Sequence, residues 1–99
     1  MQIDVSVDTC MMRLHGRFDY SVHGEFLKRA ESFVAEAVAP QVRIDMGQLD
    51  YIDSSGLGML LMMRDLAKRH DKTMTLTNVK GYVRQVIDNA QFSRLFDIS

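Results

Sequence analysis

Alternating hydrophobic and polar residues mark four short segments of the chain, and this period-two pattern indicates β-strands that bury one face. The first two segments, residues 2–7 (QIDVSV) and 11–16 (MMRLHG), are joined by only three residues, so we expect them to pair as neighbouring strands. The third segment begins with the alternation at residues 42–46 and continues through Leu49 into the stretch that follows. The fourth is the β-branched run at residues 73–77 (TMTLT).

Three further segments repeat hydrophobic residues at helical spacing. The first starts after Ser21, which is a suitable N-cap, and is ended by Pro40. Its apolar stripe consists of Val22, Phe26, Ala30, Phe33, Val34 and Ala37. We expect the second helix from about Ser55 to His70. The third is indicated by Val83, Val86, Ile87 and Ala90, and a last apolar cluster predicts a short C-terminal helix containing Phe92, Leu95 and Phe96.

The order of these elements is ββαβαβα, followed by the short C-terminal helix. This order predicts an α/β fold with a four-stranded, mostly parallel sheet, one antiparallel edge strand, and helices packed on the sheet through right-handed crossovers. A chain of 99 residues has the size of one compact domain. No repeat, linker or low-complexity segment divides it, so we expect one domain over residues 1–99.

Composition and charge exclude several classes of protein. With 46% hydrophobic and 25% charged residues the chain is globular in composition, and its longest run of large apolar residues, Met59 to Met63, is too short to span a membrane. The N-terminus lacks the features of a secretory signal, so we expect the chain to start at Met1 and to be cytoplasmic. A net charge of -1 with interleaved signs does not favour nucleic acid. Because Cys10 is the only cysteine, we expect no disulfide, metal or cofactor.

The stretch YIDSSGLG at residues 51–58 carries the candidate chemistry. Asp53, Ser54 and Ser55 follow a strand and open a helix, which places them at the carboxyl end of the sheet, where α/β folds tend to have their sites. A phosphate on a serine at a helix N-terminus is stabilised by free amides and by the helix dipole. Gly56 and Gly58 are expected to reduce steric cover around it.

A purely structural interpretation of this stretch is that Asp53 or Ser54 is an N-cap and the glycines belong to a loop. A reciprocal capping box would add Glu or Gln three residues after the cap. The residues at that spacing are Gly56 after Asp53 and Leu57 after Ser54. Capping therefore does not explain both serines.

Helical winding at 100° per residue sorts the rest of this helix into two arcs. The arc predicted to face the sheet contains Met59, Leu60, Met62, Met63, Leu66 and Ala67. Leu57 and Leu61 fall outside it, one turn apart and next to the serines, which is typical of a small recognition surface rimmed by charge. The alternative is that a loop or the C-terminal segment covers both leucines.

A serine on a strand-to-helix turn also raises the hypothesis of a hydrolase. The nucleophile elbow requires glycine two residues before the serine, whereas Ile52 and Asp53 stand at those positions. His15, His23 and His70 are the available bases, but each is expected at a surface or an element end. The sequence therefore favours a binding protein over an enzyme.

The stretch LDYIDSSGLGMLLMMRDLAKRHDKTMTLTNV, preceded by GRFDY and RIDM, resembles the STAS domains of anti-sigma factor antagonists, as a stand-alone single-domain member. The resemblance covers essentially the whole chain and implies the STAS fold. It implies phosphorylation of Ser54, the residue directly after the motif aspartate, and a partner-binding surface made of Asp53, Ser55, Gly56, Leu57, Gly58 and Leu61. The chain departs from the commonest pattern at residues 89–92 (NAQF), which lack the glycine that many members carry there.

The same resemblance implies partner switching. A serine kinase of the GHKL type, often the anti-sigma factor itself, phosphorylates the domain; the unphosphorylated form binds that partner or another effector, and a PP2C-type phosphatase restores it. We expect a monomer when the domain is free. The alternative function is a non-switching STAS scaffold or accessory subunit of a signalling or lipid-transport complex, and neighbouring genes for a kinase or phosphatase would favour switching.

Overall fold

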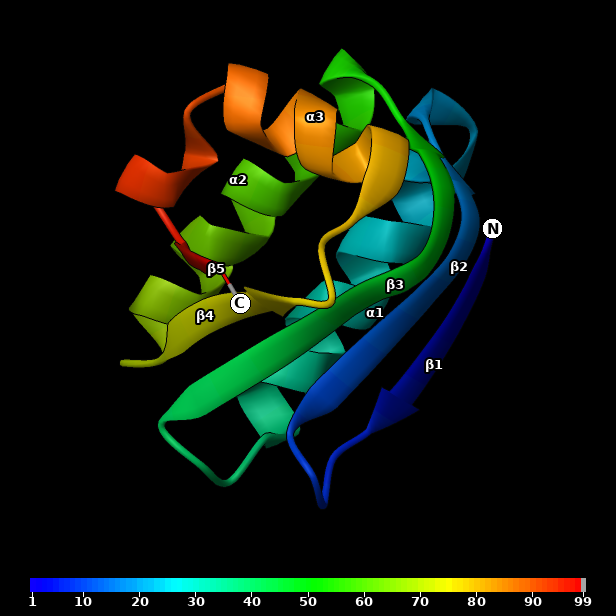
Figure 1. Cartoon of the computed structure of the whole chain (residues 1–99). Coiled ribbons are helices and arrows are strands. Elements are labelled where there is room, and N and C mark those ends of the chain that lie inside the picture. The colour runs from blue at the N-terminus through cyan, green and yellow to red at the C-terminus, as the bar shows by residue number, and fades with distance from the viewer. Residues whose placement is uncertain (99) are drawn as a thin grey trace.

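The computed structural model describes residues 1–98 and contains one mixed five-stranded sheet (Figure 1). The strands lie in chain order, and their bounds are β1 Gln2–Ser6, β2 Met11–Phe18, β3 Gln41–Ile52, β4 Thr73–Thr77 and β5 Asp97–Ile98. β1 pairs antiparallel with β2, and every other neighbouring pair is parallel. The predicted α/β architecture and antiparallel edge are confirmed, but the predicted number of four strands is one too few.

The missed strand lies in the C-terminal segment, where the sequence predicts only a short helix. Residues Phe92–Arg94 form a single 3₁₀ turn, after which β5 adds two residues to the edge of β4. Phe92 and Phe96 are buried and stack with ring centroids 5.1 Å apart, so the apolar cluster does fold back on the core. A two-residue strand is too short to produce a periodic pattern in the sequence.

Three α-helices connect the strands: α1 His23–Glu36, α2 Ser54–Arg69 and α3 Gly81–Asn89. The prediction that Ser21 caps α1 is wrong. A 3₁₀ turn at Tyr20–Val22 precedes the helix, and the carboxylate of Asp19 accepts the Ser21 amide at the start of that turn. α1 ends at Glu36, ahead of Pro40. No helix within residues 1–98 is long and apolar enough to cross a membrane.

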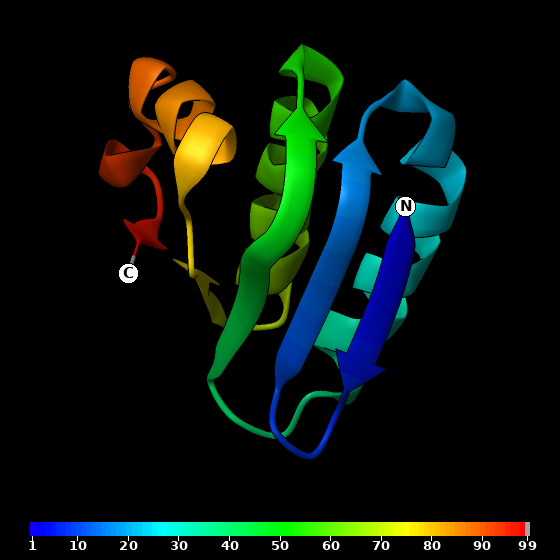
Figure 2. The same cartoon turned by 45° about the vertical axis from the view of Figure 1, so that its right-hand side comes forward.

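Helices α1 and α2 lie side by side behind the sheet, whose other face we call the outer face (Figure 2). The core between the helices and the sheet is apolar and contains Phe18, Phe26, Phe33, Ile44, Leu60, Met63 and Leu76 among its fully buried side chains. The radius of gyration, 12.1 Å, is close to the roughly 13 Å expected for a compact domain of this length.

β3 is the longest strand and extends beyond β4, which pairs only with residues 41–45. Its register against β2 shifts twice, and each shift inserts an extra residue into β3. These bulges keep Leu49 and Ile52 buried although they break the simple alternation seen at residues 42–46. The protruding end of β3 packs against α3 and leads directly to α2.

Candidate functional site

The candidate site begins where β3 passes into α2. Asp53 has extended backbone angles and is the N-cap of α2, and its Oδ1 accepts the amide of Gly56 at 3.1 Å. The main-chain carbonyl of Asp53 accepts the amide of Leu57 at 2.9 Å, which closes the first helical turn. α2 therefore starts at Ser54, one residue before the predicted start. The structural interpretation is confirmed for the Asp53 cap but wrong for Gly56 and Gly58, which belong to the helix rather than to a loop.

The two serines occupy the first two helical positions but differ in accessibility. Ser54 is exposed, whereas Ser55 is half-buried. The amides of a first helical turn have no partner within the helix, and the Asp53 side chain occupies only that of Gly56. The helix dipole also favours negative charge at this end. An anionic group attached to the Ser54 oxygen is thus compatible with the folded helix.

The two glycines of the motif have different structural roles. A β-carbon on Gly56 would stand 2.6 Å from the Phe18 carbonyl oxygen and 2.7 Å from Cγ1 of Ile52, whereas one on Gly58 would meet nothing within 4 Å. The expectation that Gly56 reduces steric cover around the serines is therefore wrong, because this buried residue lets the helix approach the end of β2. Gly58 faces open space and remains a candidate contact residue.

The predicted core arc of α2 is correct at its centre and wrong at one edge. Met59, Leu60, Met63 and Ala67 are buried, but Met62 is 48% exposed. Met62 lines an open groove between α1 and α2, together with Leu27 and Leu66, and the groove has a volume of about 480 Å³. The arc predicted from winding is too broad because the sheet covers only the middle of it.

Leu57 and Leu61 are half-buried and pack against the core, so they are not stranded outside it as the winding predicts. The C-terminal segment reaches this side of α2, where the Arg64 Nε donates to the Leu95 carbonyl at 2.8 Å. Whether the segment also covers Leu57 and Leu61, as the alternative holds, stays a prediction. Each leucine retains an exposed portion beside Ser54 and Gly58.

The end of β2 borders the site, because Phe18 is the register partner of Ile52. Asp19 follows Phe18 directly, and its carboxylate accepts hydrogen bonds from the Ser21 hydroxyl and amide, which hold the pKa of Asp19 below its ordinary value. The Arg17 Nε lies 3.7 Å from the Asp19 carboxylate. The site is therefore edged by a carboxylate that is ionised at neutral pH and by a guanidinium.

An aromatic cluster at the same end of the sheet was not predicted. The Arg17 guanidinium carbon lies 4.1 Å from the centroid of the Tyr51 ring, and the Tyr51 and Tyr82 rings stack at 5.9 Å with an angle of 12° between their planes. Arg17 comes from β2, Tyr51 from β3 and Tyr82 from the first turn of α3. We call these three residues the stack. Its members are far apart in sequence, so no local pattern reveals them.

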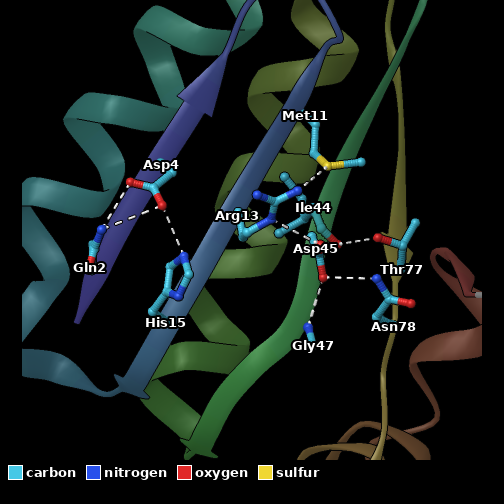
Figure 3. A network of polar contacts seen from close by, with 10 residues as sticks. All are labelled: Gln2, Asp4, Met11, Arg13, His15, Ile44, Asp45, Gly47, Thr77 and Asn78. Atoms are coloured by element: carbon cyan, nitrogen blue, oxygen red, sulfur yellow. Dashed lines mark hydrogen bonds and ion pairs between the residues drawn. The ribbon is translucent and has the colours of Figure 1, made fainter.

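A polar network on the outer face fixes the connection from β4 to α3 (Figure 3). The Asp45 carboxylate accepts the Gly47 amide at 2.9 Å, the Asn78 Nδ2 at 3.1 Å and the Arg13 Nε at 3.2 Å. Burial raises the pKa of Asp45, but these hydrogen bonds and the Arg13 charge outweigh it and leave the pKa below its ordinary value. The network therefore holds the start of the chain segment that carries Tyr82.

The histidines proposed as bases lie in other contacts. His15 pairs with Asp4 of β1 at 3.0 Å, His23 stacks on Tyr20, and His70 is the C-cap of α2, at the opposite end of that helix from Ser54. Within residues 1–98, no three His, Cys, Asp or Glu side chains gather as metal ligands would.

Known proteins with the same features identify the family. The family model described as "Mlab, STAS domain" matches residues 1–97. The chain belongs to the STAS-domain family. This STAS domain is 34% identical over 89 residues to the STAS-domain containing protein PA14_20770 of Pseudomonas aeruginosa (strain UCBPP-PA14). The match covers 89% of this chain and 85% of that protein. It is also 30% identical over 76 residues to BtrV of Bordetella bronchiseptica, which is named as a candidate anti-sigma factor antagonist. That match covers 71% of this chain and 66% of BtrV.

Solved structures confirm the predicted STAS fold. The anti-sigma factor antagonist SpoIIAA in its unphosphorylated form superposes with a TM-score of 0.70 at 19% identity, covering 99% of this STAS domain and 86% of that chain. The phosphorylated form of SpoIIAA from Bacillus gives a TM-score of 0.69 at 17% identity, with coverage of 99% and 89%. The fold described above is thus that of a protein solved in two phosphorylation states.

Proposed function

We propose that this STAS domain is a non-enzymatic anti-sigma factor antagonist whose binding is controlled by phosphorylation of Ser54. The observation that carries the proposal is the position of Ser54, exposed at the first residue of α2 behind the Asp53 cap and beside the half-exposed Leu57. Support comes from the structural likeness to SpoIIAA, which is an anti-sigma factor antagonist and exists in phosphorylated and unphosphorylated forms. The proposed partners are a GHKL-type serine kinase that acts as anti-sigma factor and a PP2C-type phosphatase.

In the proposed mechanism the unphosphorylated domain docks with the first turns of α2. Ser54 and Ser55 supply polar contacts, and the exposed portions of Leu57 and Leu61 supply apolar ones. Gly58, which faces open space, lets the partner approach the helix closely. Asp53 and Gly56 contribute by positioning the helix rather than by contacting the partner. Asp53 caps the helix, and Gly56 allows it to pack against Phe18. The partner thereby covers the Ser54 hydroxyl.

Phosphorylation opposes docking through local charge. Phosphoserine adds about -1.5 to -2 charges at neutral pH, at a position directly after Asp53 and four residues after Asp50 in the sequence. The free domain tolerates this charge at a helix N-terminus, so the fold persists. In a closed interface the same dianion is desolvated beside like charges. Reversing a complex from 99:1 to 1:99 requires about 5.5 kcal/mol of differential affinity, which a desolvated charge supplies and a screened one on the rim does not.

The phosphorylation site is tested with a purified GHKL-type serine kinase from the same genome. Wild-type protein and the Ser54→Ala and Ser55→Ala variants are incubated with ATP, and fragmentation mass spectrometry locates the phosphate. We expect phosphate on Ser54 in the wild type and in Ser55→Ala, and none in Ser54→Ala. Phosphate on Ser55 alone would contradict the assignment. If the domain were instead a non-switching subunit, neither serine would be modified and Ser54→Asp would leave binding unchanged.

A further inference from the structure

The stack formed by Arg17, Tyr51 and Tyr82 has the chemistry of a binding surface. Tyrosine and arginine are enriched among the residues that dominate protein interfaces. The Tyr82 side chain is exposed (51% of the residue), and the Arg17 side chain is 64% exposed. Both side chains pack against the Tyr51 ring of β3: Arg17 extends from the neighbouring strand β2, and Tyr82 extends from α3. Because stacking already fixes these side chains, a partner that binds them loses little conformational entropy.

The stack also lies close to Ser54. Tyr51 precedes Ser54 by three residues, and consecutive Cα atoms are at most 3.8 Å apart, so the two Cα atoms lie within roughly 11 Å of each other. A typical specific interface covers about 800 Å² on each protein, which corresponds to a circle with a radius of roughly 16 Å. A contact area of this size centred on Ser54 is large enough to include Tyr51, against which Arg17 and Tyr82 pack.

We propose that the protein partner that binds around Ser54 also binds the stack, and that this contact supplies much of its affinity and specificity. This inference rests on the proposed function. The Arg17 guanidinium is only distantly paired with Asp19, at 3.7 Å, and the Tyr82 ring presents a free aromatic surface. The fitting partner is a folded protein that places a carboxylate against Arg17 and a flat or apolar side chain against Tyr82.

Calorimetric titrations with the kinase that phosphorylates Ser54 test the stack. We expect Tyr82→Ala to weaken binding of the unphosphorylated domain by about tenfold or more and Arg17→Gln by a few fold. Val38→Ala is the matched control, because Val38 is 83% exposed but lies between α1 and the start of β3, at the opposite end of the sheet. Its affinity should stay within about twofold of wild type, since surface truncations outside an interface change little. Wild-type affinity in both stack variants would overturn the inference.

Two further measurements keep the result unambiguous. If Tyr82→Ala loosens α3, an NMR titration of the labelled wild-type domain with the kinase gives the answer without a mutation. The amide signals of Arg17, Tyr51 and Tyr82 should then shift or broaden together with Ser54, and changes confined to residues 53–61 would overturn the inference. Ser54→Asp separates the two proposals: if it weakens binding while both stack variants bind normally, the switch stands and only the role of the stack fails.

Discussion

The carbonyl oxygen of Phe18, the last residue of β2, would lie 2.6 Å from a β-carbon on Gly56, in the first turn of α2. This approach seats the Ser54 end of the helix on the sheet. Gly56→Ala should therefore destabilise the fold by about 1–3 kcal/mol, because the added methyl group displaces main chain rather than a flexible side chain. Urea unfolding measures this free energy.

Gly58→Ala is the matched control for that measurement, since its β-carbon meets open space. Alanine is the better helix former, so this variant should be more stable than wild type by about 0.5–1 kcal/mol. Similar effects of both substitutions would show that the packing against Phe18 does not decide the position of α2.

The Asp45 network makes stability depend on pH in the acid range. Because the folded-state pKa of Asp45 lies below its ordinary value of 3.8, its stabilising effect is complete above that value and is lost as the pH falls through the folded-state pKa. Asp45→Asn should cost about 1–3 kcal/mol at pH 7, since the Gly47, Asn78 and Arg13 donors lose a charged acceptor. The difference from wild type should shrink below about pH 4.

Unfolding titrations from pH 7 to pH 3 measure this dependence. Asp4→Asn serves as the control, because the Asp4 side chain is half-exposed and its hydrogen bonds, to Gln2 and His15, lie at the surface. Its substitution should change stability by less than about 0.5 kcal/mol. A constant difference between wild type and Asp45→Asn down to pH 3 would mean that the carboxylate charge is not what stabilises the network.

Gln91 occupies a left-handed backbone conformation after α3, with φ 58° and ψ 38°. A side chain raises the energy of this conformation, which glycine adopts freely. Gln91→Gly should therefore stabilise the fold by about 0.5–1 kcal/mol. The reciprocal change, Gly81→Ala, introduces a side chain at φ 61° into open space and should destabilise by a similar amount. Thermal unfolding of both variants tests this; a destabilised Gln91→Gly would show that the glutamine side chain makes the larger contribution.

Leu57 and Leu61 should contribute to both binding and stability because each is half-buried. Truncation of either to alanine should weaken partner binding by an amount on the order of 1–2 kcal/mol and lower the free energy of unfolding by about 1 kcal/mol. Met62→Ala removes a side chain from the same helix that faces the α1–α2 groove, and it should leave affinity unchanged. Calorimetry on the folded variants distinguishes the two effects, and unchanged affinity in both leucine variants would assign these residues to the core.

The sequence predicts the strands and helices well where hydrophobic residues repeat regularly. The strand at residues 73–77 and the buried centre of α2 are found as predicted. The bulges in β3 depend on its pairing with β2, and β5 contains only two residues, so neither produces a local pattern. The exposure of Met62 likewise depends on how α1 packs beside α2.

At the candidate site, the sequence locates the strand-to-helix turn and its aspartate and serines. It cannot distinguish Gly56 from Gly58, because the difference arises from Phe18, which lies in another strand. The stack cannot be predicted from the sequence for the same reason. Its three residues, Arg17, Tyr51 and Tyr82, come into contact only when β2, β3 and α3 pack together. Long-range packing, rather than local propensity, determines these features.

Phosphate on Ser54 should weaken partner binding without refolding the domain. The most direct measurement is the calorimetric affinity of the phosphorylated and unphosphorylated domain for the anti-sigma factor kinase, with amide NMR spectra of both free forms. We predict a loss of affinity of about 5.5 kcal/mol if the charge is fully enclosed, and spectral changes confined to the surroundings of residues 50–65. Equal affinities of the two forms would contradict the switch, and spectral changes across the whole sheet would contradict its local mechanism.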